Sequence, residues 1–140
     1  MSQKDPLKKK ILIVEDNKDS SEILGLFISR IGHQVIKACN SKEAIAHAEA
    51  ELPDLIFMDM GLPDLDGVKT TAILKKNPKT SHIPVVAVTA WMSALSEEKA
   101  SRVGITTYLL KPVSPQTLRE TIEEYSRGSF TRGKAMTFRI

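Results

Sequence analysis

Five residues that could bind a metal ion or hold a phosphoryl group stand directly after short apolar runs. Glu15 and Asp16 follow "ILIV", Asp59 follows "LIFM", Thr89 follows "VVAV" and Lys111 follows "YLL". Three carboxylates that meet at one place repel each other and resist ionisation unless a cation compensates. An all-oxygen cluster selects a hard cation, and few protein ligands leave room for water and phosphate, which favours Mg²⁺ over Ca²⁺. We therefore predict Mg²⁺ as the cofactor.

Lys111 and Thr89 suit an anion with several oxygens better than they suit a metal ion alone. The ammonium of Lys111 would oppose a bare cation, whereas a phosphoryl group could offer one oxygen to the metal and others to Lys111 and Thr89. An aspartate can act as the nucleophile and carry the phosphate as an acyl phosphate, and Asp59 is central among these residues. The pattern predicts phosphoryl transfer to Asp59.

Alternating strands and helices are expected to position these residues. Unbroken apolar runs are typical of strands buried on both faces, and they occur at 11–14, 35–38, 55–58, 85–88 and 108–110. Helical spacing of apolar residues predicts helices over 20–31, 41–52, 66–77, 93–103 and from 114 to 125. Ser41 and Ser114 are the predicted N-caps of two of these helices, with Pro115 at a first helical position.

A β-α unit repeated five times predicts a three-layer α/β/α sandwich around a parallel sheet with right-handed crossovers. Ligands bind such sheets outside the carboxyl ends of the strands. Residues that are far apart in the sequence but follow different strands are therefore expected to gather at one edge of the sheet. The predicted site is assembled from four strand ends.

Length and composition indicate one globular domain. The chain has 140 residues, of which 41% are hydrophobic and 26% charged. Its single cysteine, Cys39, excludes an internal disulfide and is expected to be a small buried residue. Neither a signal peptide nor a membrane span is apparent in the sequence, so a cytoplasmic protein without a membrane partner is expected.

The net charge of +3 is concentrated at the two ends of the chain. The first ten residues are strongly basic, and residues 127–140 carry four bases and no acid. The residues between these ends have a net negative charge, which argues against direct nucleic-acid binding. For the basic C-terminal segment, a flexible tail is favoured over a partner-docking segment or the stub of a linker.

The sequence resembles the receiver domain of two-component response regulators, of the single-domain kind. "LIVEDN" matches the acidic pair of that family, "DLIFMDMGLPDLDG" its phosphoacceptor loop, "VVAVTA" its hydroxyl position and "YLLKP" its lysine followed by proline. The resemblance implies a flavodoxin-like strand order 2-1-3-4-5. It also implies a receiver domain over residues 10–127, between a flexible N-terminus at 1–9 and a basic tail at 128–140.

The resemblance also assigns roles to the site residues. Asp59 would take the phosphoryl group from a sensor histidine kinase or a histidine phosphotransferase. Asp16 and Asp59 would bind Mg²⁺ directly together with the backbone carbonyl of Gly61, and Glu15 would bind it through water. The chain would then be no dedicated enzyme, although it would take part in its own Mg²⁺-dependent phosphorylation and dephosphorylation.

Further roles concern switching. Lys111 would hold a phosphate oxygen from a cis peptide bond to Pro112. Thr89 would move toward the phosphoryl group and Tyr108 would swing inward with it, which would change the partner preference of the face formed by helix 4, strand 5 and helix 5. Trp91 and Gly61 flank the phosphoryl position and would tune its lifetime, with the Trp91 indole slowing hydrolysis.

Other functions fit the sequence less well. A phosphatase of the haloacid dehalogenase type needs a second acid two residues after the nucleophile, where this chain has Gly61. A flavodoxin-type electron carrier would need a phosphate-binding first loop, which Glu15 and Asp16 would repel. A receiver-like interaction module that works without phosphorylation is the serious alternative. A phosphorelay carrier or protein-binding regulator is favoured over a piece of a longer regulator or hybrid kinase.

Overall fold

The computed structural model describes residues 8–90, 97–105, 107–126 and 138–139. Its strands are β1 (Lys10–Val14), β2 (Gln34–Ala38), β3 (Leu55–Asp59), β4 (Val85–Thr89), β5 (Thr107–Leu110) and β6 (Phe138–Arg139). Its helices are α1 (Lys18–Ile31), α2 (Ser41–Glu51), α3 (Gly67–Lys76), α4 (Glu97–Arg102) and α5 (Pro115–Ser126). The part of the fourth helix predicted before Glu97 lies outside the described residues.

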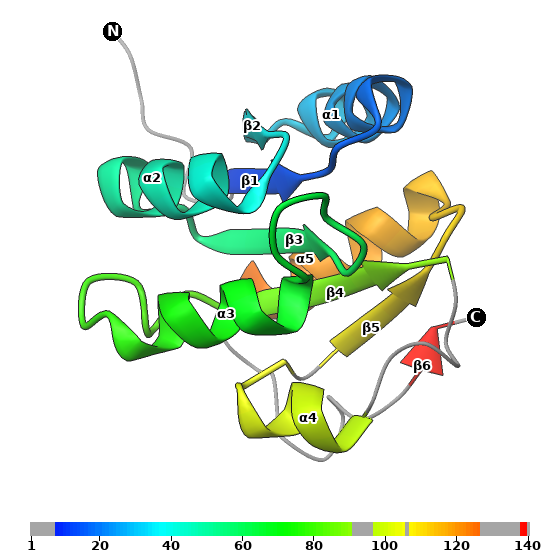
Figure 1. The fold of residues 1–140 in the computed structure, drawn as a ribbon. Coiled ribbons are helices and arrows are strands. Elements are labelled where there is room, and N and C mark those ends of the chain that lie inside the picture. Colours follow the sequence, from blue (N-terminus) through cyan, green and yellow to red (C-terminus); the bar gives the residue numbers. More distant parts are fainter. Residues whose placement is uncertain (1–7, 91–96, 106, 127–137, 140) are drawn as a thin grey trace, which may run out of the picture.

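All strands belong to one parallel sheet, in the order β2-β1-β3-β4-β5-β6 (Figure 1). The first five strands confirm the predicted order 2-1-3-4-5. Within the sheet, Val14 of β1 lies opposite Met58 of β3, and Asp59 of β3 lies opposite Val88 of β4. The carboxyl ends of β1, β3 and β4 therefore lie next to one another, as the prediction of a shared site requires.

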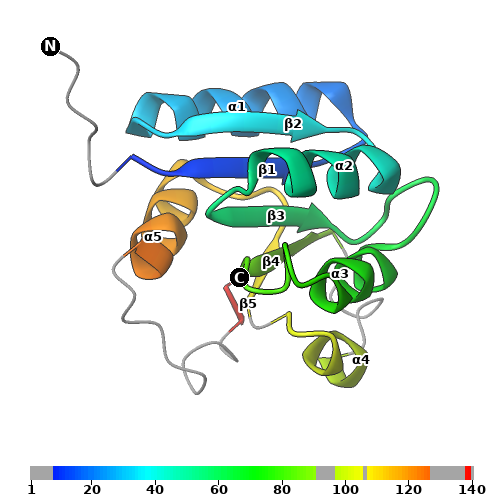
Figure 2. The same ribbon diagram turned by 90° about the vertical axis from the view of Figure 1, so that its left-hand side faces the viewer.

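Side chains of the central strands point alternately to the two faces of the sheet, and each face is covered by helices. Ile11 and Ile13 of β1 pack with Ile28 of α1 and Leu118 of α5. Intervening strand residues pack on the other face, in a cluster that includes residues of α2, α3 and α4. Figure 2 shows α1 and α5 on one side of the sheet and α2, α3 and α4 on the other. Burial on both faces explains why the strands appear as unbroken apolar runs.

The caps of the helices agree only in part with the sequence prediction. Ser114 accepts a hydrogen bond from Thr117 N (3.1 Å) and Pro115 begins α5, as predicted. The prediction for α2 was wrong, because Asn40 is the N-cap and its side chain accepts from Glu43 N at 2.8 Å. Ser41 is already helical, and its hydroxyl is buried among groups of another segment.

Strand β6 is an addition to the predicted fold. Phe138 and Arg139 belong to the segment expected to be a flexible tail, yet they pair in parallel with Tyr108 and Leu109 of β5 (Figure 1). The preceding part of that segment, and residues 1–7, lie outside the described residues. Among the described helices, none combines the length and apolar character needed to cross a membrane.

Candidate functional site

The predicted site residues do gather at the carboxyl edge of the sheet. Asp59 and Thr89 are the last residues of β3 and β4, while Glu15 and Lys111 follow β1 and β5 directly. The backbone N–H of Lys111 donates to the carbonyl of Thr89 at 2.8 Å, which fixes the start of the β5–α5 loop beside β4. Parallel strand pairing thus brings together side chains that are up to 96 residues apart in the sequence, Glu15 and Lys111.

Glu15, Asp16 and Asp59 form one carboxylate cluster. Each offers an oxygen, and these oxygens lie within 4.8 Å of one another. Glu15 and Asp59 are only 3% and 7% exposed, whereas Asp16 is exposed to solvent. The cluster is therefore walled by protein on the side of the sheet and open on the side of Asp16.

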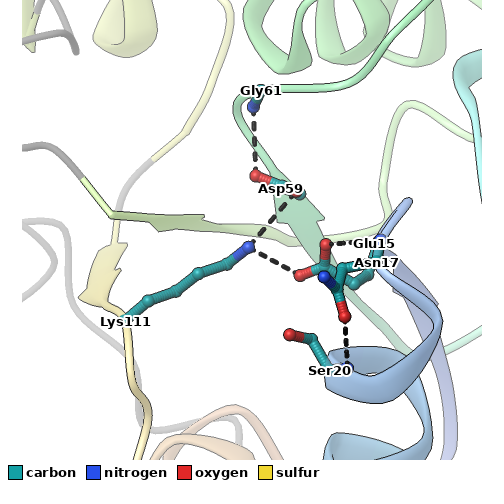
Figure 3. Close-up of polar contacts among 6 residues, drawn as sticks. All are labelled: Glu15, Asn17, Ser20, Asp59, Gly61 and Lys111. Carbon is teal, nitrogen blue, oxygen red and sulfur yellow. Dashed lines mark hydrogen bonds and ion pairs between the residues drawn. The ribbon is translucent and has the colours of Figure 1, made fainter.

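Lys111 crosses this cluster from β5 and pairs with two of its members (Figure 3). Its Nζ lies 2.6 Å from Oε1 of Glu15 and 3.3 Å from Oδ2 of Asp59. Burial lowers the pKa of Lys111, but the hydrogen bond to Glu15 and the charges of Asp59 and Glu15 outweigh it, so its pKa lies above the ordinary value. Lys111 thus offsets part of the negative charge of the cluster.

Burial raises the pKa of the Glu15 carboxyl above its ordinary value. Hydrogen bonds from Lys111 and from the backbone N–H of Asn17 oppose this effect, and the negative charge of Asp59 adds to it. Glu15 Oε2 accepts from Asn17 N at 3.0 Å. Burial outweighs these two bonds, so a further positive charge beside Glu15 would favour its ionised form.

Asn17 is a site residue that the sequence interpretation missed. Its side chain caps α1 by accepting from Ser20 N at 2.9 Å, while its own N–H donates to Glu15 (Figure 3). One residue thus joins the start of α1 to the carboxylate cluster. The sequence contained a signal for this capping role, because asparagine is a favoured N-cap residue and Asn17 stands just before a helical pattern.

The loop after Asp59 turns its backbone toward the carboxylate. Oδ1 of Asp59 accepts from the N–H of Gly61 at 3.0 Å (Figure 3). A Cβ atom added at Gly61 would meet only Asp59 Oδ1, at 3.9 Å. Position 61 therefore faces the carboxylate closely enough for a side chain to influence it, in keeping with the tuning role that remains a prediction. Trp91, the second predicted tuning residue, lies outside the described residues.

Gly67 closes the same loop, and we expect Gly67→Ala to destabilise the fold. A Cβ atom there would lie 2.8 Å from the carbonyl oxygen of Asp59 and 3.0 Å from Cα of Met60. Both are backbone atoms, so the loop that carries Asp59 would have to shift. The expected loss is about 1–3 kcal/mol in the free energy of unfolding, measured by urea denaturation.

Gly61→Ala is the matched control for this substitution. It makes the same chemical change near the start of the loop that Gly67 follows, but the added Cβ atom would meet open space apart from the ordinary contact with Asp59. Its free energy of unfolding should stay within about 0.5 kcal/mol of the wild type. Equal losses in both variants would contradict the steric explanation for Gly67.

Thr89 and Tyr108, the predicted switch residues, are both buried. Tyr108 is fully buried in β5 and packs on the face of the sheet covered by α2, α3 and α4, in the same cluster as Ala100 of α4. The bond between Lys111 and Pro112 is cis, as predicted. Tyr108 thus already points inward in this structure, and the switching roles of both residues stay predictions.

Cys39 is exposed, so its expected burial was wrong. Ala38 fills the buried last position of β2, and the next side chain points the other way, toward the first turn of α2. There the Cys39 thiol donates to Oε1 of Glu43 at 3.2 Å, and the Cys39 N–H donates to the same oxygen at 3.0 Å. The thiol bond to Glu43 raises the pKa of Cys39, and the negative charge of Glu43 adds to this effect.

We therefore expect Glu43→Gln to make Cys39 more reactive. Loss of the carboxylate charge lowers the thiol pKa, so a larger share of thiolate should raise the rate of iodoacetamide alkylation at pH 8 about two- to fivefold. Glu49→Gln makes the same change elsewhere on α2 and should leave the rate unchanged. A rate for Glu43→Gln equal to the wild type would contradict the assigned pKa shift.

A pocket of about 360 Å³ opens beside the carboxylate cluster, between α1 and the β5–α5 loop. Glu15 and Lys111 are its charged lining residues, and Ile23, Leu24 and Val113 supply apolar walls. Ile23 is 52% exposed to solvent. A side chain from another molecule could therefore approach Glu15 and Lys111 along an apolar surface.

Comparison with protein families gives a match over most of the chain. The family model of the response regulator receiver domain matches residues 11–123. The chain is 37% identical over 119 residues to the polar-differentiation response regulator DivK of Brucella anthropi, covering 85% of this chain and 97% of DivK. The DivK of Brucella ovis is 36% identical over the same length.

Solved structures show the same fold. Chemotaxis protein CheY4 of Vibrio cholerae superimposes with a TM-score of 0.80 at 24% identity, covering 84% of this chain and 98% of CheY4. A putative response regulator from Chloroflexus aurantiacus gives a TM-score of 0.78 at 28% identity, covering 86% of this chain and 98% of that structure.

Proposed function

This chain belongs to the response regulator receiver domain family, and on that premise we propose that Asp59 is its phosphoacceptor in two-component signalling. Receiver domains of response regulators are not dedicated enzymes; the proposal concerns which residues carry out the phosphoryl transfer. The observation that carries it is the convergence on Asp59 of Lys111, the Gly61 N–H and two further carboxylates. We propose the domain as residues 10–127, followed by the tail 128–140.

The carboxylate cluster fits a Mg²⁺ ion by the chemistry of its donors. All three groups supply hard oxygen ligands, and the exposed side at Asp16 leaves positions for water and for a phosphoryl oxygen. Asp16 and Asp59 would hold the ion directly with the carbonyl of Gly61, and Glu15 would hold it through water. When bound, Mg²⁺ would neutralise charge on the phosphoryl oxygens.

The proposed transfer forms a bond between an Asp59 carboxylate oxygen and phosphorus. The bond between phosphorus and the imidazole nitrogen of the donor phosphohistidine breaks, and the imidazole leaves with its electron pair and takes up a proton. Lys111 already lies 3.3 Å from Asp59, so its ammonium is placed to hold an incoming phosphoryl oxygen. Thr89 ends the neighbouring strand and would hold another oxygen.

The same geometry supports a proposal for the partners. A histidine kinase or a histidine phosphotransferase would present its phosphohistidine through the pocket between α1 and the β5–α5 loop, where apolar walls lead to Lys111. A downstream protein would read the face of α4, β5 and α5. Tyr108 lies in β5 and packs in the same cluster as Ala100 of α4, so a movement of Tyr108 would reach that face.

Incubation with acetyl phosphate or phosphoramidate in the presence of Mg²⁺ tests this function. Intact mass spectrometry should show a gain of one phosphoryl group that disappears when EDTA removes the metal. Borohydride reduction of the acyl phosphate, followed by peptide mapping, should place the modification at Asp59.

The absence of any gain would argue for the alternative function if two conditions hold. Circular dichroism must show an intact fold, and a phosphorylated histidine kinase must also fail as donor. The chain would then be a receiver-like interaction module that works without phosphorylation. A gain that maps to another residue would equally overturn the assignment of Asp59.

A further inference from the structure

We propose that the N-terminus of α2 anchors the β3–α3 loop, residues 60–66, and that Ser41 and Asp64 are thereby positioning residues for Asp59. This inference rests on the proposed function in so far as Asp59 is the phosphoacceptor. Neither residue contacts the carboxylate cluster directly. Their effect would reach Asp59 through the backbone of the loop that both of them hold.

Asp64 binds the first turn of α2 with both of its carboxylate oxygens. Oδ1 accepts from Ser41 N at 2.9 Å and Oδ2 from Lys42 N at 3.2 Å. The first N–H groups of a helix have no partner within the helix and carry partial positive charge, so a carboxylate is a favourable ligand for them. The bond from Ser41 N keeps the pKa of the Asp64 carboxyl below its ordinary value. The contact is thus charged at neutral pH.

The Ser41 hydroxyl makes a second, buried connection to the same loop. Its Oγ lies 2.9 Å from the carbonyl of Leu65 and 2.6 Å from the hydroxyl of Thr70, which itself lies 2.8 Å from the carbonyl of Asp66. Ser41 is 2% exposed and Thr70 fully buried. Buried hydroxyls without a partner are costly, so this arrangement fixes the loop carbonyls against α2.

The loop is therefore held at both ends. At its start, Gly61 N donates to Asp59 Oδ1 at 3.0 Å; at its end, Gly67 N donates to the carbonyl of Met60 at 3.3 Å. Asp64 lies between these two contacts and is held by α2. Without that anchor, the loop is expected to fluctuate and to release the Gly61 N–H from Asp59 more often.

Helix α2 has an N-cap residue besides its contacts with Asp64, and this helps to separate the two effects experimentally. Asn40 supplies the cap by accepting from Glu43 N at 2.8 Å. Asn40→Ala therefore weakens the start of α2 without removing a contact to the loop, whereas Asp64→Ala removes the loop contact and leaves the cap. Asp64→Asn retains one acceptor oxygen and should restore part of the lost function.

The test uses the full chain and two measurements. The first is the amide hydrogen exchange rate of the Gly61 N–H, which NMR measures directly in the absence of a phosphodonor. We expect Asp64→Ala and Ser41→Ala to raise its exchange rate about tenfold and Asp64→Asn to raise it less, with Asn40→Ala close to the wild type. The second is the rate of phosphorylation by saturating acetyl phosphate. This rate should fall about three- to tenfold in Asp64→Ala and Ser41→Ala, less in Asp64→Asn, and little in Asn40→Ala.

The outcomes separate this inference from the proposed function. If Asn40→Ala changes Gly61 exchange as much as Asp64→Ala, the effect is general destabilisation and the anchor is refuted. Unchanged exchange in Asp64→Ala also refutes it. If the wild type accepts no phosphoryl group, the proposed function fails, and the positioning role toward a phosphoacceptor falls with it. The exchange data would then still report on the loop contact.

Discussion

Asp59→Asn should not gain a phosphoryl group from acetyl phosphate, whereas the wild type should gain one. Asparagine has nearly the same shape and keeps an oxygen that can accept the N–H of Gly61, as Oδ1 of Asp59 does at 3.0 Å. Its amide nitrogen, however, is no nucleophile toward phosphorus. The rate should fall at least about 100-fold, which places it below detection by intact mass spectrometry.

The same variant should not lose stability. Glu15, Asp16 and Asp59 offer oxygens within 4.8 Å of one another, so the removal of one negative charge relieves repulsion in the cluster. The midpoint of thermal unfolding should therefore be equal to or above that of the wild type. This result would show that the loss of phosphorylation is chemical and does not come from unfolding.

Asp54→Asn is the control for charge and composition. Asp54 immediately precedes β3, at the end of the strand opposite to Asp59, and accepts from Lys10 N at 2.8 Å. The variant has the same net charge and composition as Asp59→Asn. It should be phosphorylated at the rate of the wild type, and a loss equal to that of Asp59→Asn would contradict the assigned acceptor.

Lys111→Met should separate metal binding from phosphoryl transfer. The ammonium of Lys111 lies 2.6 Å from Glu15 and 3.3 Å from Asp59, so it competes with a divalent cation for the same oxygens. Without this competitor, Mg²⁺ affinity should rise about tenfold, as measured by isothermal titration calorimetry. Phosphorylation should nevertheless slow by roughly 100- to 1,000-fold, because the cation that holds a phosphoryl oxygen is gone.

Opposite signs in these two measurements are the decisive feature of the prediction. Destabilisation of the site would lower both Mg²⁺ affinity and phosphorylation, so a decrease in both would count against the role assigned to Lys111. Lys76→Met removes an exposed lysine in the last turn of α3 and should change neither quantity.

The gathering of the site could be predicted from the sequence because it depends only on strand ends. Apolar runs that are buried on both faces predict parallel strands, and the residue after each run then lies at the carboxyl edge whatever the details of packing. Asp59, Thr89 and Lys111 were located in this way. The layers and the parallel sheet followed from the same alternation.

The charge balance of the site could not be predicted in this way. The sequence suggested carboxylates that repel each other until a metal ion arrives, whereas the structure shows Lys111 between Glu15 and Asp59. Which partner a long lysine side chain selects depends on side-chain positions across the sheet, and no local pattern encodes them. The two hydrogen bonds from the N-terminus of α2 to Asp64 could not be predicted for the same reason, because they also join segments that are distant in the sequence.

Errors at Cys39 and Ser41 have a simpler physical origin, since each depends on one residue of register. The last buried position of β2 is Ala38, and a shift of one residue turns a side chain to the other face. In α2, Asn40 and Ser41 are both good caps by type, and only the geometry shows that Ser41 uses its hydroxyl elsewhere.

Strand β6 affects where a reporter or affinity tag should be attached to this protein. Arg139 of β6 pairs with Leu109 on the outer edge of β5, so a fluorescent protein or affinity tag fused after Ile140 would be separated from β6 by a single residue. Such a fusion would place bulk beside the face that we propose a downstream protein reads. Lys10 begins β1 at the end of the strands opposite to Asp59, so a label attached ahead of β1 is preferable to one attached after β6.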